Sequence, residues 1–208
     1  MKKQILIISI SLTIIICAVC VSYSADVQND LAQSVVRLHI LANSDSCEDQ
    51  MLKLAVRDRI LSDGRELFKD AASKEETEKI LCGNIDFLTA AAKDEIEKNG
   101  YSYDVRIDIG KYEFPMKKYD GFAFPAGEYD AVRVEIGEAK GHNWWCVMFP
   151  PLCFVDASVG EESAQLLRQS LTDEEMDIIT SDADVDIRFK VVDFVQNSIH
   201  GIKTALKK

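Results

Sequence analysis

The stretch VVRLHILANSDS, residues 35–46, decides the fold because it joins an apolar strand directly to a helix start. Its first part is typical of a buried β-strand, with one face formed by Val36, Leu38 and Ile40. Its polar end predicts a helix, since Ser46 is followed three residues later by Asp49 in a capping-box pattern. A strand followed at once by a capped helix indicates a sheet that is covered by helices.

The hydrophobic period changes twice in the rest of the chain. Apolar spacings of three and four predict helices from Ser46 to about Phe68 and from Ser73 to Asn99. Alternation then predicts strands, which we place at 103–109, 129–136 and 143–149, with a tight aromatic loop at 122–127. The last of these strands is apolar on both faces, so we expect it at the centre of the sheet. Helical patterns return after Thr172 and over residues 184–206.

This order of elements predicts an α+β fold with a mostly antiparallel sheet and helices packed on one side. No repeat, low-complexity tract or linker interrupts residues 25–208, and that length is enough for one hydrophobic core. We therefore expect a single exported domain over 25–208, behind an N-terminal segment of residues 1–24.

The N-terminal segment has the pattern of a signal peptide or a membrane anchor. Lys2 and Lys3 precede an uncharged, mostly apolar run at residues 5–21, and positive charge before such a run stays on the cytoplasmic side. The run is intermediate in length between a signal-peptide core and a spanning helix. A small-x-small pattern at 22–24 favours cleavage before Ala25, and an uncleaved anchor with membrane contact is the alternative. Either outcome places the rest of the chain outside the cytoplasmic membrane.

The net charge bears on the class of partner. The formal net charge of the chain is −11, and the exported part is more acidic still, because the leader carries only the charges of Lys2 and Lys3. Such a surface repels a phosphate backbone. We therefore expect no nucleic-acid partner.

The cysteines divide by compartment. Cys17 and Cys20 lie inside the apolar run, whereas four others lie in the exported part, where oxidation is allowed: Cys47, Cys82, Cys146 and Cys153. Cys146 and Cys153 flank a Pro-Pro turn and are candidates for a disulfide, and two buried free thiols are the alternative. No second ligand pair has a spacing suited to zinc, so we expect no metal and no cofactor.

The polar face of the first strand is a candidate partner-binding site. By strand parity, Arg37 and His39 lie opposite the apolar face, and Asn43 and Asp45 continue that side toward the helix start. Such a cluster beside a helix N-terminus could bind an anion or a partner's carboxylate. The alternatives are a satisfied helix cap beside a half-exposed strand face, and an acid/base pair of His39 with Asp45.

Two adjacent indoles extend this hypothesis. Trp144 and Trp145 point to opposite faces of their strand, so we expect one in the core. The exposed one is a candidate anchor for a partner, because aromatic residues dominate binding hot spots.

Two stretches of the chain carry a family resemblance. The first is residues 35–46, continued by matching positions as far as residue 58, and the second holds FPAGEY at 124–129, NWWCV at 143–147 and FPPLCF at 149–154. Together they closely resemble the stage II sporulation protein R family of endospore-forming Firmicutes. Cys47 departs from the pattern, because that family often has Pro at this first helical position.

The resemblance implies a function. Members of this family are exported from the forespore into the intermembrane space of the sporulation septum. There they trigger a membrane-embedded aspartic protease of the mother cell, which processes the sigma-E precursor. The resemblance thus implies a messenger without catalytic residues.

Two other classes of function are alternatives to the messenger. One is a secreted thiol hydrolase that acts on the cell wall through Cys146 and His142. It is disfavoured because four residues of extended strand separate the two side chains by about 13 Å. The other is a structural septal protein, which the sequence leaves open.

Overall fold

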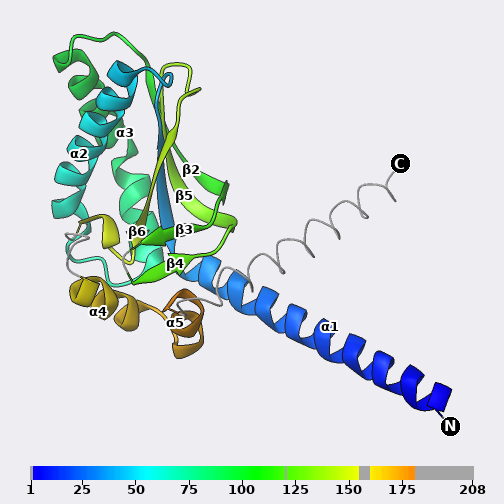
Figure 1. The fold of residues 1–208 in the computed structure, drawn as a ribbon. Helices are drawn as coiled ribbons and strands as arrows, with labels where there is room; N and C mark the ends of the chain where they lie inside the picture. Colours follow the sequence, from blue (N-terminus) through cyan, green and yellow to red (C-terminus); the bar gives the residue numbers. More distant parts are fainter. Residues whose placement is uncertain (1, 120, 155–159, 181–208) are drawn as a thin grey trace.

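The computed structural model of the chain describes residues 2–119, 121–154 and 160–180 (Figure 1). Its first helix, α1 (Lys2–Ser34), projects away from the body that the other elements form. Only the end of α1 reaches that body, where Val27 and Leu31 are buried. Among the residues described, no helix combines the length and the hydropathy that a membrane crossing needs. The helix predicted over 184–206 lies outside the described residues.

A four-stranded sheet forms the centre of the body. Its order is β2 (Val105–Phe114), β5 (Gly127–Ile136), β1 (Val36–Leu41) and β6 (Asn143–Phe149). β1 runs parallel to β5 but antiparallel to β6, and β2 runs antiparallel to β5. The α+β class and the mostly antiparallel sheet are therefore confirmed. β1 has a neighbour on each side and is buried along its whole length, as the apolar stretch predicted.

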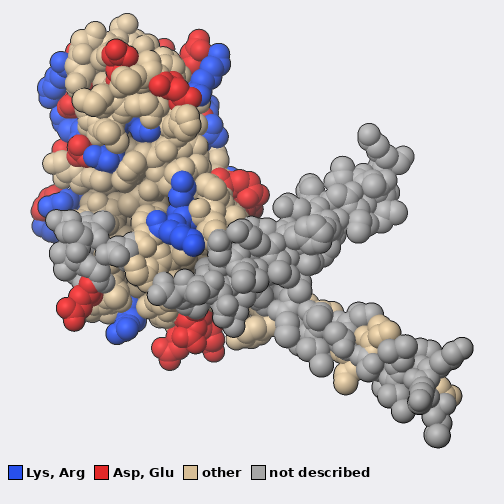
Figure 2. All heavy atoms as spheres, in the orientation of Figure 1, with Lys and Arg blue, Asp and Glu red and all other residues tan. Residues whose placement is uncertain are grey.

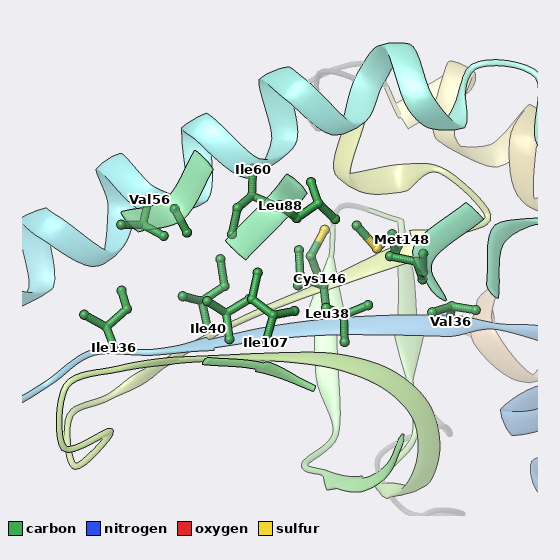
Figure 3. Close-up of a cluster of buried hydrophobic side chains, with 14 of the residues drawn as sticks. Val36, Leu38, Ile40, Val56, Ile60, Leu88, Ile107, Ile136, Cys146 and Met148 are labelled. Atoms are coloured by element: carbon green, nitrogen blue, oxygen red, sulfur yellow. The ribbon is translucent and has the colours of Figure 1, made fainter. Parts of the chain in front are cut away.

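Two long helices, α2 (Cys47–Phe68) and α3 (Lys74–Lys98), cover one face of the sheet. Their predicted caps are present, because the Ser46 and Ser73 hydroxyls each accept a hydrogen bond from a backbone amide three residues later. Figure 3 shows the core between helices and sheet, which includes Val36, Leu38, Ile40, Val56, Ile60, Leu88, Ile107, Ile136 and Met148. The odd-numbered apolar positions of β2 and the even-numbered ones of β1 thus meet in this first core.

The opposite face carries a second core at one end of the sheet. There a hairpin of β3 (Lys117–Tyr119) and β4 (Phe122–Phe124) packs with the end of α1 and with α4 (Gly160–Ser170) and α5 (Asp173–Thr180). Its buried members include Leu31, Val35, Phe114, Phe124, Tyr129, Ala131, Val147, Leu167 and Ile179. The predicted start of a helix after Thr172 is confirmed, since its hydroxyl accepts from the amide of Glu175.

Two sequence predictions were wrong. Residues 122–127 were expected as a loop, but β4 pairs residues 122–124 with β3. The strand at 143–149 was expected at the centre, yet β6 is at the edge of the sheet. Its two apolar faces have another cause: Cys146 and Met148 face the first core, while Val147 faces the second.

Candidate partner-binding site

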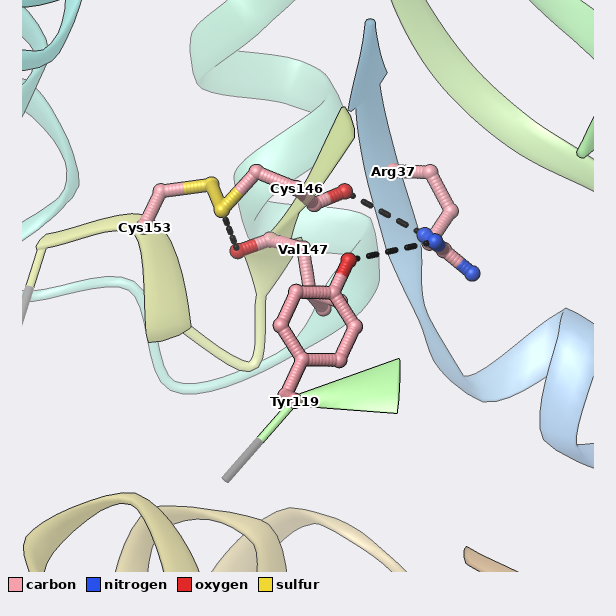
Figure 4. Close-up of a disulfide and its surroundings, with 5 residues drawn as sticks. All are labelled: Arg37, Tyr119, Cys146, Val147 and Cys153. Atoms are coloured by element: carbon pink, nitrogen blue, oxygen red, sulfur yellow. Dashed lines mark hydrogen bonds between the residues drawn. A yellow bond between two sulfur atoms is a disulfide. The ribbon is translucent and has the colours of Figure 1, made fainter. Parts of the chain in front are cut away.

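Arg37 lies inside the second core and is fully buried. Its guanidinium carbon is 4.6 Å from the ring centre of Phe114, 5.1 Å from that of Phe124 and 5.0 Å from that of Tyr129. Nε donates to the carbonyl of Cys146 at 3.2 Å, and Nη2 donates to the Tyr119 hydroxyl at 3.3 Å (Figure 4). Burial lowers the pKa of Arg37, because a charged group loses its water. The site is therefore a cage of aromatic rings around a cation.

His39 lies two residues farther along the same face of β1 and is only 4% exposed. Its ring stacks on Trp145, with centroids 4.9 Å apart and planes 19° apart, and it also contacts Tyr112 and Phe114. Burial, and then the nearby charges of Arg133 and Arg37, lower the pKa of His39 to about 4. The imidazole is therefore neutral at pH 7.

Arg133 completes what we name the basic cluster: Arg37, His39 and Arg133. It is the β5 partner of His39 in the parallel ladder. Its guanidinium lies 5.2 Å from the ring centre of Tyr112, and Nη2 is 2.5 Å from a carboxylate oxygen of Glu135. Because Arg133 is partly exposed, it lies at the boundary between the buried part of the cluster and solvent.

Asn43 and Asp45 do not join the basic cluster. Asn43 donates to the carboxylate of Asp49 at 2.8 Å and accepts from the amide of Glu138 at 2.9 Å. Asp45 accepts from the backbone amide of His142 at 2.6 Å and pairs with Nδ1 of its ring. The hydrogen bond from the His142 side chain, and then the one from its amide, lower the pKa of Asp45. These two residues therefore tie the turn after β1 to the turn before β6.

This arrangement corrects the predicted polar surface. Arg37 and His39 were candidates for a partner-binding face, with a half-exposed strand face as the alternative, but the aromatic side chains of the second core bury both. The predicted pair of His39 with Asp45 is not formed, because the partner of Asp45 is His142. Of the four predicted residues, only Asn43 and Asp45 lie at the surface. Their hydrogen bonds join two turns of the chain.

The two indoles lie on opposite faces of β6, as predicted, but neither is fully buried. Trp144 packs beside the first core under the guanidinium of Arg57, at 5.1 Å. Trp145 packs beside the second core, with the ammonium of Lys117 at 5.7 Å from its ring centre. Trp145 thus covers His39 and is itself partly open to solvent.

The structure joins Cys146 and Cys153 in a disulfide, with Cα atoms 5.9 Å apart (Figure 4). The bridge ties β6 to the short 3-10 helix η1 (Leu152–Phe154), across the cis Phe149–Pro150 peptide. Cys47 and Cys82 are exposed free thiols. The sulfur that a thiol hydrolase would need at Cys146 is therefore already bonded.

The aromatic cage was missed from the sequence, although one signal for it was present. On β2 the apolar residues change from odd positions (Ile107, Ile109) to even ones (Tyr112, Phe114). A change of parity within a strand moves the apolar face to the other side of the sheet. It therefore marks a second core on the face that carries Arg37 and His39.

No group of His, Cys, Asp and Glu side chains within the described residues is arranged to hold a metal ion. The basic cluster is suited instead to an anion, since its unpaired positions include N–H donors of Arg37, Arg133 and His39. The chemistry available here is recognition of negative charge.

Comparison with known proteins gives the family. The family model described as stage II sporulation protein R matches residues 32–159. A protein of that name from Bacillus subtilis (strain 168) is 42% identical over 131 residues, which cover 63% of this chain and 58% of the relative. The alignment thus spans less than two thirds of the relative's length. No solved structure matches the chain. The matched range contains all of the sheet and both covering helices, and the chain belongs to the stage II sporulation protein R family.

Proposed function

We propose that the chain is an exported sporulation messenger that activates a membrane-embedded aspartic protease and so triggers processing of the sigma-E precursor. The observation that carries this proposal is the family match over residues 32–159. That range includes the strand-to-helix stretch and the tryptophan-cysteine stretch on which the resemblance rests. The proposed location is the intermembrane space of the sporulation septum.

The N-terminal segment supports export. Two lysines precede the apolar run, which is the arrangement that directs the following chain across the membrane. Among the α1 side chains that the structure describes, the first buried one is Val27, so a leader that ends at residue 24 could be removed or retained without loss of the contacts from Val27 onward. The proposal therefore accommodates both a cleaved and an anchored messenger.

We propose further that the chain activates by binding and is not itself a hydrolase. The family name denotes a sporulation protein and no enzyme class, and the Cys146 sulfur is held in a disulfide. A protein that acts by binding needs an accessible recognition surface, and aromatic side chains such as Trp145 are suited to that role.

Co-expression tests the proposal. The full chain is produced together with the protease and the sigma-E precursor, and precursor length is followed by immunoblotting. We expect shortening only when all three are present. Two controls isolate the cause: a protease without its catalytic aspartate, and a chain with Ile7→Asp and Ile14→Asp, whose leader no longer supports export. Unchanged precursor with the parent chain, or equal shortening with the export-deficient variant, would refute the messenger.

A further inference from the structure

The basic cluster contains buried nitrogen atoms without hydrogen-bond partners among the described residues. Among the described residues, Nη1 of Arg37, Nε of Arg133 and both ring nitrogens of His39 are buried and make no hydrogen bond. Figure 4 shows the third nitrogen of Arg37 directed away from both Cys146 and Tyr119. Buried polar groups are nearly always paired, so several unpaired groups on neighbouring positions of two strands need an explanation.

Charge makes the cluster more unusual. No carboxylate forms an ion pair with Arg37 within the described part of this acidic chain. Glu135 pairs with Arg133, and other acidic side chains lie away from the cluster, for example over α5, where Figure 2 shows Asp and Glu gathered at the surface. A buried cation without a counter-ion is costly, and burial, followed by the charges of Arg133 and Arg37, lowers the pKa of His39 and keeps it neutral. An anion would supply hydrogen-bond acceptors for the unpaired N–H groups and a counter-ion for Arg37.

The cluster lies beneath a small cover. Tyr119 of the β3–β4 hairpin caps Arg37 through its hydroxyl, and Lys117 of the same hairpin lies over Trp145. Trp145 and Tyr112 in turn cover His39, and both are partly exposed. Among the described residues, these side chains and the hairpin form part of the cover over the unpaired groups.

We propose that the basic cluster is a binding site for a carboxylate of a protein partner, supplied by an Asp or Glu side chain. This inference rests on the proposed function, since the partner would be the activated protease. The carboxylate takes the free Nη1 of Arg37, an N–H of His39 and Nε of Arg133. Aromatic walls of Phe114 and Trp145 hold the aliphatic part of the acidic side chain.

The chemistry favours a carboxylate over a phosphate. Three aromatic ring centres lie within 5.1 Å of the Arg37 guanidinium carbon, and Nη1 makes no hydrogen bond, so we expect an anion to bind at that nitrogen. A carboxylate presents two oxygens, each of which can accept more than one hydrogen bond, to the three donors of the cluster. A phosphate group presents three oxygens in a tetrahedral arrangement and more charge to be neutralised than the cluster supplies.

Histidine NMR tests the site directly. The full chain in detergent micelles carries ¹³C-labelled histidine, and the resonances of His39, His142 and His200 are assigned by substitution of each in turn. Sodium acetate and sodium phosphate are the probes, titrated at pH 7 against sodium chloride of equal ionic strength. We expect a saturable shift of His39 with acetate, and none of His142, whose ring is paired with Asp45.

Two arginine variants make the test specific. Arg133→Gln should weaken acetate binding on the order of tenfold, because a charge-assisted hydrogen bond is lost. Arg106→Gln is the matched control, since Arg106 also contacts Glu135 but is exposed and outside the basic cluster. No shift of His39, or equal weakening by both variants, overturns the site. Tighter binding of phosphate than of acetate overturns the carboxylate assignment.

The processing assay separates this inference from the proposed function. Arg133→Gln should abolish precursor shortening while Arg106→Gln retains it. If Arg133→Gln loses acetate binding but still supports normal shortening of the precursor, the partner binds elsewhere. The proposed messenger function would not be refuted by that result. Absence of shortening with the parent chain would refute the messenger and the protease as partner, while the acetate titration still decides whether the site binds a carboxylate.

Discussion

The imidazole of His39 stacks on the indole of Trp145, with ring centres 4.9 Å apart, in a site that leaves both of its nitrogens unpaired. Burial favours the neutral ring, and the charges of Arg133 and Arg37 oppose its protonation. Folding is therefore coupled to pH through this one residue.

The sign of that coupling follows from the depressed pKa. The pKa of His39 is about 4 in the folded chain, against 6.5 in the unfolded one. The stabilisation is thus complete above pH 6.5 and is lost as the pH falls toward 4, by about 3 kcal/mol in all. His39→Phe should keep the aromatic packing and flatten this part of the pH profile. Urea unfolding at pH 7 and pH 4.5 measures the difference.

His142→Gln is the control for that experiment, because His142 is an exposed histidine outside the second core. Carboxylates also titrate near pH 4, so the parent and the variant are compared in how much their free energy of unfolding changes with pH. If the free energy of unfolding changes equally between pH 7 and pH 4.5 in His39→Phe and in the parent, the imidazole of His39 is not buried in its neutral form.

Arg37 provides a second prediction about stability. Arg37→Met places an apolar chain of similar length among Phe114, Phe124 and Tyr129, and removes a buried charge without a counter-ion. Replacement of buried charge by packed apolar groups is often neutral or stabilising. We expect the free energy of unfolding to stay within about 1 kcal/mol of the parent, while Arg37→Ala lowers it by about 2–4 kcal/mol through a cavity. Chemical denaturation of both variants decides the matter.

An equal loss of stability in Arg37→Met and Arg37→Ala would have a different meaning. The two hydrogen bonds of the guanidinium, to Cys146 and Tyr119, would then hold β6 and the hairpin to β1. The main contribution of Arg37 would then be to the stability of the fold.

The first core was predicted from the sequence, and the second was missed although the change of parity in β2 indicates it. Parity within residues 35–42 assigned Val36, Leu38 and Ile40 to one face, and the serine caps located α2 and α3. These signals are local, so a single segment carries them. Burial of Arg37 depends instead on the hairpin at 117–124, which is far away in sequence. Nothing within the first strand indicates that an arginine there would be covered, and a polar residue on a strand face is ordinarily exposed.

The disulfide gives a prediction about both chemistry and stability. In the exported protein, alkylation without reductant should modify Cys47 and Cys82 and spare Cys146 and Cys153, as read by peptide mass. Joint replacement of Cys146 and Cys153 by Ala should lower the free energy of unfolding by about 2–3 kcal/mol, because a short loop is released. Cys82→Ala is the control and should change little. Full alkylation of Cys146 in unreduced protein would rule the bridge out.

The last prediction concerns the boundary between leader and domain. We expect the mature protein to begin at Ala25, because the small residues Ser22 and Ser24 fit a signal-peptidase site. Val27 and Leu31 lie beyond that point and are buried in the body, and the side chain of Gln28 donates to the carbonyl of Ala126. Cleavage there would leave these contacts intact, whereas Leu31→Ala should lower the free energy of unfolding by about 2–4 kcal/mol. Intact mass of the exported protein measures the first amino acid, and Ser24→Phe should block processing and retain the full-length mass. A parent protein that keeps its leader after export would identify the apolar run as an anchor and place the messenger at the membrane surface.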